Sequence, residues 1–171
     1  MMSPWKVLPL VAAIALVACG GGSSSGGSIA GGSGSGTGDS ANIGQFVNCP
    51  TEGLGYEIVE TGETGLTGEN GEYEFSPNSS VRFFLGKIEL GTAPAGGIVM
   101  PTDLQSSENG ANNVARFLET LDEDRNCDNG IVITDAVRQA AEDATQTAVS
   151  ASDFDVESSA FETSEAANFA R

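Results

Sequence analysis

An apolar run followed by a Gly/Ser tract occupies the start of this chain and limits how much of it can fold. A lysine precedes the run Val7–Val17, whose length and charge order are typical of a secretory signal and which is shorter than a membrane span. The Gly/Ser tract offers too little apolar surface to offset the entropy of ordering. We therefore expect a signal in residues 1–18, a flexible tether in residues 19–44 and a single folded domain in residues 45–171.

The four residues Leu16-Val17-Ala18-Cys19 end the apolar run and resemble the lipobox of bacterial lipoproteins, in which a small residue precedes an obligatory cysteine. The resemblance implies cleavage before Cys19, a diacylglyceryl group on its sulfur and, in Gram-negative species, a further acyl group such as palmitate on its amine. Gly20 implies, by the rule of that family, export to the outer membrane. We therefore expect the protein to bind the membrane through Cys19. The sequence does not distinguish a domain on the periplasmic face of the outer membrane from one on the cell surface. The alternatives are an ordinary secretory signal cut elsewhere and a transmembrane anchor.

Two further cysteines, Cys49 and Cys127, lie in the part of the chain that is expected to fold. Because the compartment beyond the inner membrane is oxidising, we expect a disulfide between them. The alternative is a metal site, but two cysteines without a histidine fall short of the usual zinc ligand set.

The chain is strongly acidic, with a formal net charge of −17. A surface of this charge repels nucleic acid and anionic lipid headgroups, so we expect no nucleic-acid partner. The carboxylates either keep the domain soluble outside the cell or include a set that holds divalent cations.

Apolar residues alternate with polar ones in several short segments of the first half of the domain, as in half-buried strands. The segments contain Tyr56 and Ile58; Tyr73 and Phe75; Val81, Phe83 and Leu85; and Ile88 and Leu90. Between the first two lies Asn70-Gly71, a pair that favours a hairpin turn. This pattern predicts a small antiparallel sheet or sandwich.

The apolar period changes after Pro101 to one that is typical of helices. Val114, Phe117, Leu118 and Leu121 share one helical face, which Asn112 or Asn113 could cap. After the short apolar step Ile131–Ile133, Thr134 or Asp135 can cap a second helix with the inward stripe Val137, Ala140, Ala141 and Ala144. Phe154, Val156, Phe161 and Phe169 are expected to pack against the sheet. The predicted class is α+β, with two or three short C-terminal helices after the sheet or sandwich.

A second resemblance covers roughly residues 53–161. The segment Leu66–Phe75 resembles the hairpin of prealbumin-like sandwich modules, as in carboxypeptidase regulatory-like domains. The segments Val81–Gly86 and Ala115–Asp122 are similar to an N-terminal module of proteobacterial surface lipoproteins. That module implies no activity, and it often precedes larger domains, so the chain is either a stand-alone form or the N-terminal module of a longer surface protein.

Three acidic residues and an asparagine alternate along one loop, which is how a calcium loop presents its oxygen ligands: Asp122, Asp124, Asn126 and Asp128. The pattern resembles the start of an EF-hand or thrombospondin-repeat loop but departs from the EF-hand at Cys127 and Ile133. We predict Ca²⁺ binding with a dissociation constant of about 0.1–1 mM. The alternative is an acidic loop that is simply solvated.

Catalytic signatures are few in this sequence. The absence of histidine excludes Ser-His and Cys-His nucleophile pairs and the common zinc hydrolase sites. We therefore expect a non-catalytic role in binding, adhesion or envelope structure, with a protein or glycan as partner. The alternative is a small periplasmic carbohydrate-acting hydrolase that uses two carboxylates, a pair that only a spatial separation could identify.

Overall fold

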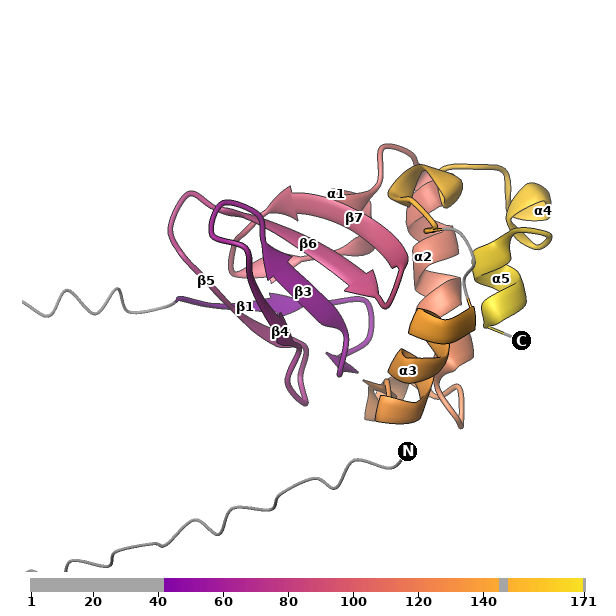
Figure 1. The fold of residues 1–171 in the computed structure, drawn as a ribbon, viewed down its shortest axis with the longest axis horizontal. Coiled ribbons are helices and arrows are strands. Elements are labelled where there is room, and N and C mark those ends of the chain that lie inside the picture. Colours follow the sequence, from indigo (N-terminus) through magenta and orange to yellow (C-terminus); the bar gives the residue numbers. More distant parts are fainter. Residues whose placement is uncertain (1–41, 145–147, 171) are drawn as a thin grey trace, which may run out of the picture. The chain divides into compact units, whose positions relative to one another are not determined.

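The computed structural model describes residues 42–144 and 148–170, and β-strands make up the first half of this part (Figure 1). The larger sheet has the strand order β4-β3-β6-β7 and is antiparallel throughout. Its strands are β3 (Gly55–Ile58), β4 (Glu63–Leu66), β6 (Ser80–Leu85) and β7 (Ile88–Pro94). The alternating segments that contain Tyr56, Val81 and Ile88 therefore form strands of one sheet.

The smaller sheet has the strand order β5-β1-β8, with β1 in the centre. Its strands are β1 (Asn42–Phe46), β5 (Glu72–Phe75) and β8 (Ile98–Val99). β1 pairs with β5 in the antiparallel and with β8 in the parallel sense. Since β1 begins at Asn42, residues 42–44 belong to the sheet and not to the tether that the Gly/Ser composition predicts for them.

The two sheets face each other, and we call them together the sandwich. In β6 the side chains of Val81, Phe83 and Leu85 are buried, while their neighbours in the strand are partly exposed, as the alternation predicts. The ring of Phe83 lies 4.8 Å from that of Phe46 and 5.3 Å from that of Tyr73, measured between centroids. Because Phe46 and Tyr73 come from the smaller sheet, these contacts form the core between the sheets.

The predicted hairpin at Asn70-Gly71 is wrong. The turn exists, with the Gly71 N–H donating to the Gly68 carbonyl over 2.9 Å and Gly71 at φ 82°. However, β4 pairs with β3 and β5 pairs with β1, so the turn carries the chain from one sheet to the other. A favourable turn dipeptide fixes a local reversal but not the partners of the strands that it joins.

A short parallel pair lies beside the sandwich, formed by β2 (Thr51–Glu52) and β9 (Ile131–Val132). A buried hydroxyl supports it, because Thr67 Oγ1 donates to the Thr51 carbonyl over 2.5 Å and accepts from the Leu54 N–H over 3.0 Å. This pair joins the first half of the domain to the segment that follows the longest helix.

Helices follow the strands, which confirms the predicted α+β class (Figure 1). They are α1 (Pro101–Leu104), α2 (Glu108–Leu121), α3 (Asp135–Ala144), α4 (Ser158–Phe161) and α5 (Glu165–Phe169), with the 3-10 turns η1 (Cys127–Asn129) and η2 (Ala151–Asp153). The cap of α2 is Ser107, whose Oγ accepts from the Gly110 N–H over 3.1 Å, and not Asn112 or Asn113. Asn113 is instead fully buried within the helix.

The inward stripe predicted for α3 is correct in part. Ala141 is fully buried and Val137 is half-buried, whereas Ala140 is exposed, and the side chain of Ala144 lies outside the described residues. Gly86, in the turn between β6 and β7, approaches the helix so closely that a Cβ there would lie 2.8 Å from the backbone carbon of Ala141. This turn and the helix therefore pack backbone to backbone.

The late aromatic residues do not chiefly cover the sheet, as the sequence pattern predicts, but gather around α2. The ring of Phe117 lies 5.5 Å from that of Phe154 and 6.5 Å from that of Phe169, and Phe154 lies 5.3 Å from Phe161. We call these four residues the helical aromatic cluster. It belongs to the same continuous apolar core as the sandwich. No helix among the described residues is both long and apolar enough to cross a membrane.

Candidate functional site

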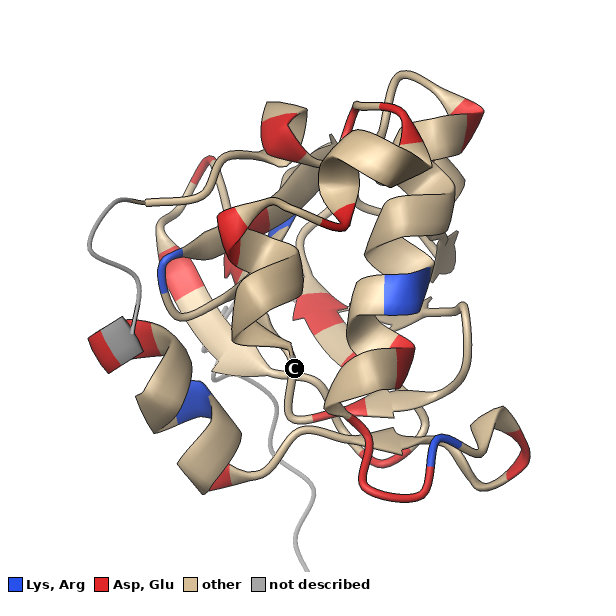
Figure 2. Ribbon diagram, turned by 90° about the vertical axis from the view of Figure 1, so that its right-hand side faces the viewer, with Lys and Arg blue, Asp and Glu red and all other residues tan. Residues whose placement is uncertain are grey.

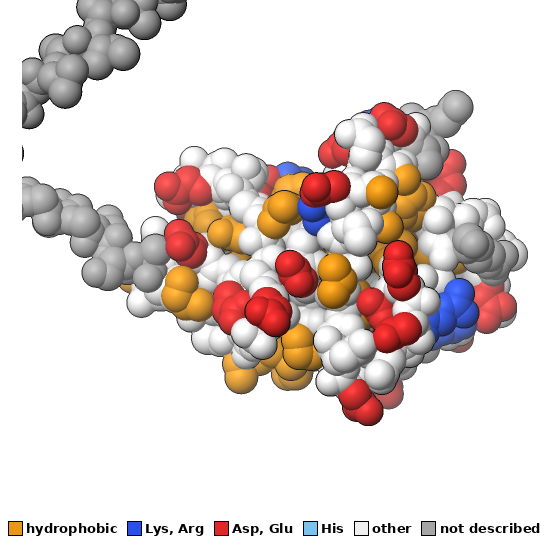
Figure 3. All heavy atoms as spheres, turned by 90° about the horizontal axis from the view of Figure 1, so that it is seen from below, with side chains coloured by type: hydrophobic (Ala, Val, Ile, Leu, Met, Phe, Trp, Pro, Cys, Tyr) orange, Lys and Arg blue, Asp and Glu red, His pale blue; other side chains and the backbone are white. Residues whose placement is uncertain are grey.

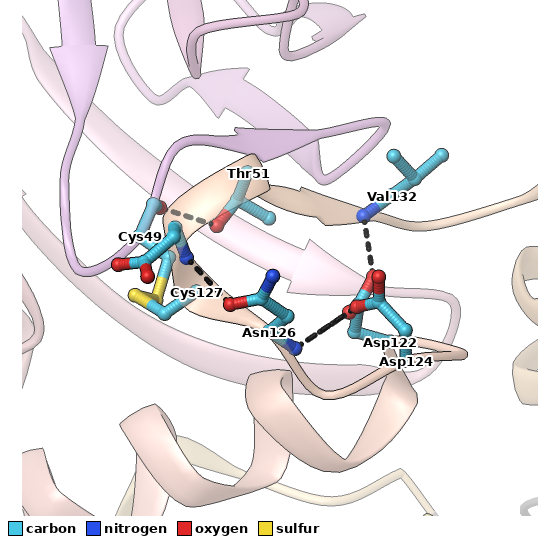
Figure 4. The surroundings of a disulfide bond; sticks show 8 residues. Cys49, Thr51, Asp122, Asp124, Asn126, Cys127 and Val132 are labelled. Carbon is cyan, nitrogen blue, oxygen red and sulfur yellow. Dashed lines mark hydrogen bonds between the residues drawn. A yellow bond between two sulfur atoms is a disulfide. The ribbon is translucent and has the colours of Figure 1, made fainter.

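The acidic loop predicted to bind calcium starts at the C-terminus of α2 (Figure 4). Asp122 is buried, and its carboxylate accepts from the backbone N–H of Val132 over 3.2 Å and of Asn126 over 3.4 Å. The Val132 bond attaches the end of α2 to β9. The Asp122 carboxylate therefore holds the loop closed by accepting hydrogen bonds from backbone N–H groups of the loop and of β9.

The next polar residues of the loop are also engaged within it. The carboxylate of Asp124 accepts from the Asn129 side-chain amide over 2.8 Å and from the Asn126 N–H over 2.9 Å. The Asn129 amide, the neighbouring Asp122 and the Asn126 N–H together hold the pKa of Asp124 below its usual value. Asn126 Oδ1 in turn accepts from the Asp128 N–H over 3.2 Å, which caps η1.

Cys49 and Cys127 form a disulfide, the pair expected from the sequence (Figure 4). Their Cα atoms lie 5.3 Å apart although 78 positions separate them in the chain. Next to the disulfide the Ile131 N–H donates to the Pro50 carbonyl over 2.7 Å. The acidic loop is thus attached to the turn after β1 by a covalent bond and a hydrogen bond.

The calcium site itself remains a prediction. Among residues 42–144 and 148–170, no three acidic or cysteine side chains are grouped so that they could hold a metal ion. Calcium takes six to eight oxygen ligands, and several oxygens of Asp122, Asp124 and Asn126 already accept hydrogen bonds from the loop. The closed loop shown here would have to exchange some of these bonds for metal ligands.

A second candidate site is a cavity of about 520 Å³ that the sequence did not predict. It is lined by Tyr56 and Ile58 of β3, Glu63 of β4, and Glu74 and Phe75 of β5, together with hydroxyl side chains such as that of Thr61. β4 and β5 are edge strands of different sheets. The cavity therefore lies at one edge of the sandwich, between an edge strand of each sheet.

Tyr56 connects the two sheets at this cavity. Its Oη accepts from the Glu74 backbone N–H over 3.3 Å, and its ring lies 5.8 Å from that of Tyr73. Its ring also covers Gly65, where a Cβ would come within 2.6 Å of the Tyr56 Cζ. A glycine at position 65 is therefore what allows the aromatic side chain to lie across β4.

Tyr73 lies deeper and has a structural role. Its Oη donates to the Gly96 carbonyl over 2.8 Å and accepts from the Gly96 N–H over 3.0 Å. Burial raises the pKa of the Tyr73 hydroxyl, so it stays neutral and keeps both bonds at physiological pH. This tyrosine ties the loop before β8 to the sandwich core.

Acidic residues are spread over helices, loops and strands, with few basic residues among them (Figure 2). On the face seen in Figure 3, exposed apolar side chains lie between acidic ones. Within residues 42–144 and 148–170, the large apolar residues that are exposed include Ile43, Val59, Leu66, Ile98, Met100 and Val132. Cys19, the predicted lipidation site, lies outside the described residues.

Comparison of the chain with protein-family models, with curated proteins and with solved structures finds no match in any of the three. A function must therefore be argued from the residues of this chain.

Proposed function

We propose that this chain is a non-catalytic envelope lipoprotein, anchored through acyl chains on Cys19 in the outer membrane of a Gram-negative bacterium and serving a binding role. The observation that carries the proposal is the use of the three cysteines. Cys49 and Cys127 pair with each other, which leaves Cys19, the cysteine that ends the lipobox-like segment, for acylation.

The disulfide also supports export, because such bonds persist in oxidising compartments and are rare in the bacterial cytosol. The high negative charge also fits the proposal, because it repels the folded domain from the anionic lipid headgroups of the membrane that holds the acyl chains. The predicted Gly/Ser tether would supply the distance, with an average reach of roughly 25–30 Å for about 25 residues.

The proposal is tested by mass spectrometry of the N-terminal peptide after expression in a Gram-negative host. We expect cleavage before Cys19 and a mass that includes diacylglyceryl and a third acyl chain. Cys19→Ser should abolish the modification and release the protein from the membrane fraction. The matched control is the double variant Cys49→Ser/Cys127→Ser, which should remain acylated. An unmodified Cys19 in the wild type would overturn the proposal.

A relation to prealbumin-like modules is part of this proposal, because two facing sheets are compatible with such a module. The Leu66–Phe75 segment, however, joins the two sheets and does not form the hairpin on which the resemblance rests.

A carbohydrate-acting hydrolase is the second candidate, because Glu63 and Glu74 are both among the residues that line one cavity. An enzyme of this kind should release nitrophenol from a panel of nitrophenyl glycosides, and Glu63→Gln and Glu74→Gln should each abolish that release. Activity that survives both substitutions would not come from this cavity.

A further inference from the structure

We propose that the cavity between β3, β4 and β5 binds a guanidinium group, such as the arginine side chain of a partner protein. The inference names the ligand class for the binding role proposed above and rests on that role. The volume of the cavity, about 520 Å³, lies within the range of ligand pockets, roughly 300–1,000 Å³.

The aromatic part of the lining suits a planar cation. Tyr56 and Phe75 are both half-buried, so each ring packs on the core and keeps part of its surface in the cavity. The ring of Tyr73 lies behind them, 5.8 Å from Tyr56 and 5.7 Å from Phe75, and fixes their positions. A cation within about 6 Å of an aromatic face is attracted by the ring quadrupole, and the flat guanidinium also stacks on the ring.

The charge of the lining determines whether the cavity favours a cation or an anion. Glu63 lines the cavity on the face that it shares with its cross-strand partner Ile58, and no positively charged residue is among the described residues that line the cavity. Within residues 42–144 and 148–170, the Glu63 carboxylate forms no ion pair with a lysine or arginine of the chain. An uncompensated carboxylate favours a cation and disfavours an anion, and it can accept a charge-assisted hydrogen bond from a guanidinium.

A hydroxyl group at the rim helps to fix the Glu63 carboxylate. Thr61 Oγ1 donates to Glu63 Oε2 over 3.0 Å and accepts from the Glu63 N–H over 3.3 Å. On the other side, the backbone of Glu74 is held by Tyr56 Oη. Glu63 is therefore held in place on β4, and Tyr56 bridges the larger sheet to β5 at the same cavity.

The test uses the chain from residue 19 onward with Cys19→Ser, which retains all the residues that the structure describes. Without the signal, which contains the single tryptophan, Tyr56 and Tyr73 are the only tyrosine or tryptophan fluorophores. N-acetyl-arginine-amide is titrated at 150 mM salt, and the tyrosine emission is followed. N-acetyl-citrulline-amide, its neutral isostere, is the matched probe. We expect the arginine probe to bind at least about tenfold more tightly.

The variants separate this cavity from the general acidity of the protein. Glu63→Gln should weaken binding of the arginine probe by about three- to tenfold. Glu69→Gln, which removes the same charge from an exposed turn outside the cavity, should leave it unchanged. Phe75→Leu should weaken binding while the thermal midpoint shows that the domain stays folded.

Equal binding of the two probes would overturn the inference, as would equal losses from Glu63→Gln and Glu69→Gln. Tighter binding of N-acetylglucosamine than of the arginine probe would also overturn it and would favour a glycan site. These outcomes are independent of acylation at Cys19, which the mass measurement tests separately.

Discussion

The sandwich and the region that follows it are held together in different ways. In the sandwich, backbone ladders connect the strands, and side chains add to a structure that the backbone already specifies. In the helical region, residues 101–144 and 148–170, the segments after α3 are short, and they attach to α2 through the helical aromatic cluster and a few polar side chains. Single side chains therefore carry more of the tertiary structure in the helical region than in the sandwich.

The largest effect is expected from Phe117→Ala. Phe117 is almost completely buried and contacts Phe154 and Phe169, so its loss should cost about 3–5 kcal/mol of unfolding free energy. Urea denaturation followed by circular dichroism measures this. The control is Phe84→Ala, at a partly exposed position on the outer face of the larger sheet, which should cost clearly less. Equal costs would remove the difference between the two regions.

Removal of the disulfide comes next, because it is the covalent link between the regions. The double variant Cys49→Ser/Cys127→Ser should lose about 2–4 kcal/mol, mainly because the unfolded chain is no longer closed into a loop. The difference in urea midpoint between oxidised and reduced wild type should agree with the variant. A disulfide that contributes nothing measurable would mean that non-covalent contacts, such as the β2–β9 pair and the packing of Gly86 on α3, suffice to hold the two regions together.

Asn113→Ala should cost about 1–3 kcal/mol, since it removes two hydrogen bonds of a buried amide and leaves the Val156 carbonyl without this donor. Asn113 Nδ2 donates to the carbonyls of Phe154 and Val156, each over 2.9 Å. Asn112→Ala, on the exposed side of the same helix, is the matched control and should be nearly neutral. Hydrogen exchange should show faster opening of residues 151–170 in Asn113→Ala alone. Similar behaviour of the two variants would contradict this role.

Calcium should have a smaller effect. With a dissociation constant of about 0.1–1 mM, 1 mM Ca²⁺ would stabilise the domain by about 0.4–1.4 kcal/mol. The thermal midpoint in calcium and in chelator measures it, with Asp124→Asn/Asp128→Asn as the variant that should lose the response. An unchanged wild-type midpoint would identify the loop as a hydrogen-bonded acidic turn.

The smallest effect concerns pH. Hydrogen bonds from the hydroxyls of Ser106 and Ser107 hold the pKa of Asp155 below its usual value. The folded state therefore binds fewer protons than the unfolded state, so this stabilisation is present above a pH of about 4 and is lost as the pH falls through the folded-state pKa. Asp155→Asn should lower the urea midpoint at pH 7 and change it less at pH 3. The same loss at both values would contradict this linkage.

The sequence predicted the elements with a strong period and missed those without one. β6 and α2 carry alternating or helical apolar patterns, and both form as expected. β4 has the sequence Glu63-Thr64-Gly65-Leu66, which offers one large apolar residue, and its strand conformation depends on pairing with β3. Short strands of this kind are specified by tertiary contacts and not by their own residues.

The same reasoning explains the two candidate sites. The disulfide followed from the cysteine count, and the acidic loop is continuous in the sequence. The cavity could not be predicted, because Glu63 and Glu74 come from edge strands of different sheets, and only the crossing of the chain between the sheets brings them together.

The central position of β1 has a mechanical consequence for a protein held by its N-terminus. A pull on the chain before Asn42 would load two rows of backbone hydrogen bonds at once, those to β5 and those to β8, and would shear them instead of peeling an edge strand away. Beyond β1 the load would reach Cys49, which passes it through a covalent bond to the segment after α2. An anchor at Cys19, as proposed above, would therefore load the centre of the smaller sheet and the disulfide first.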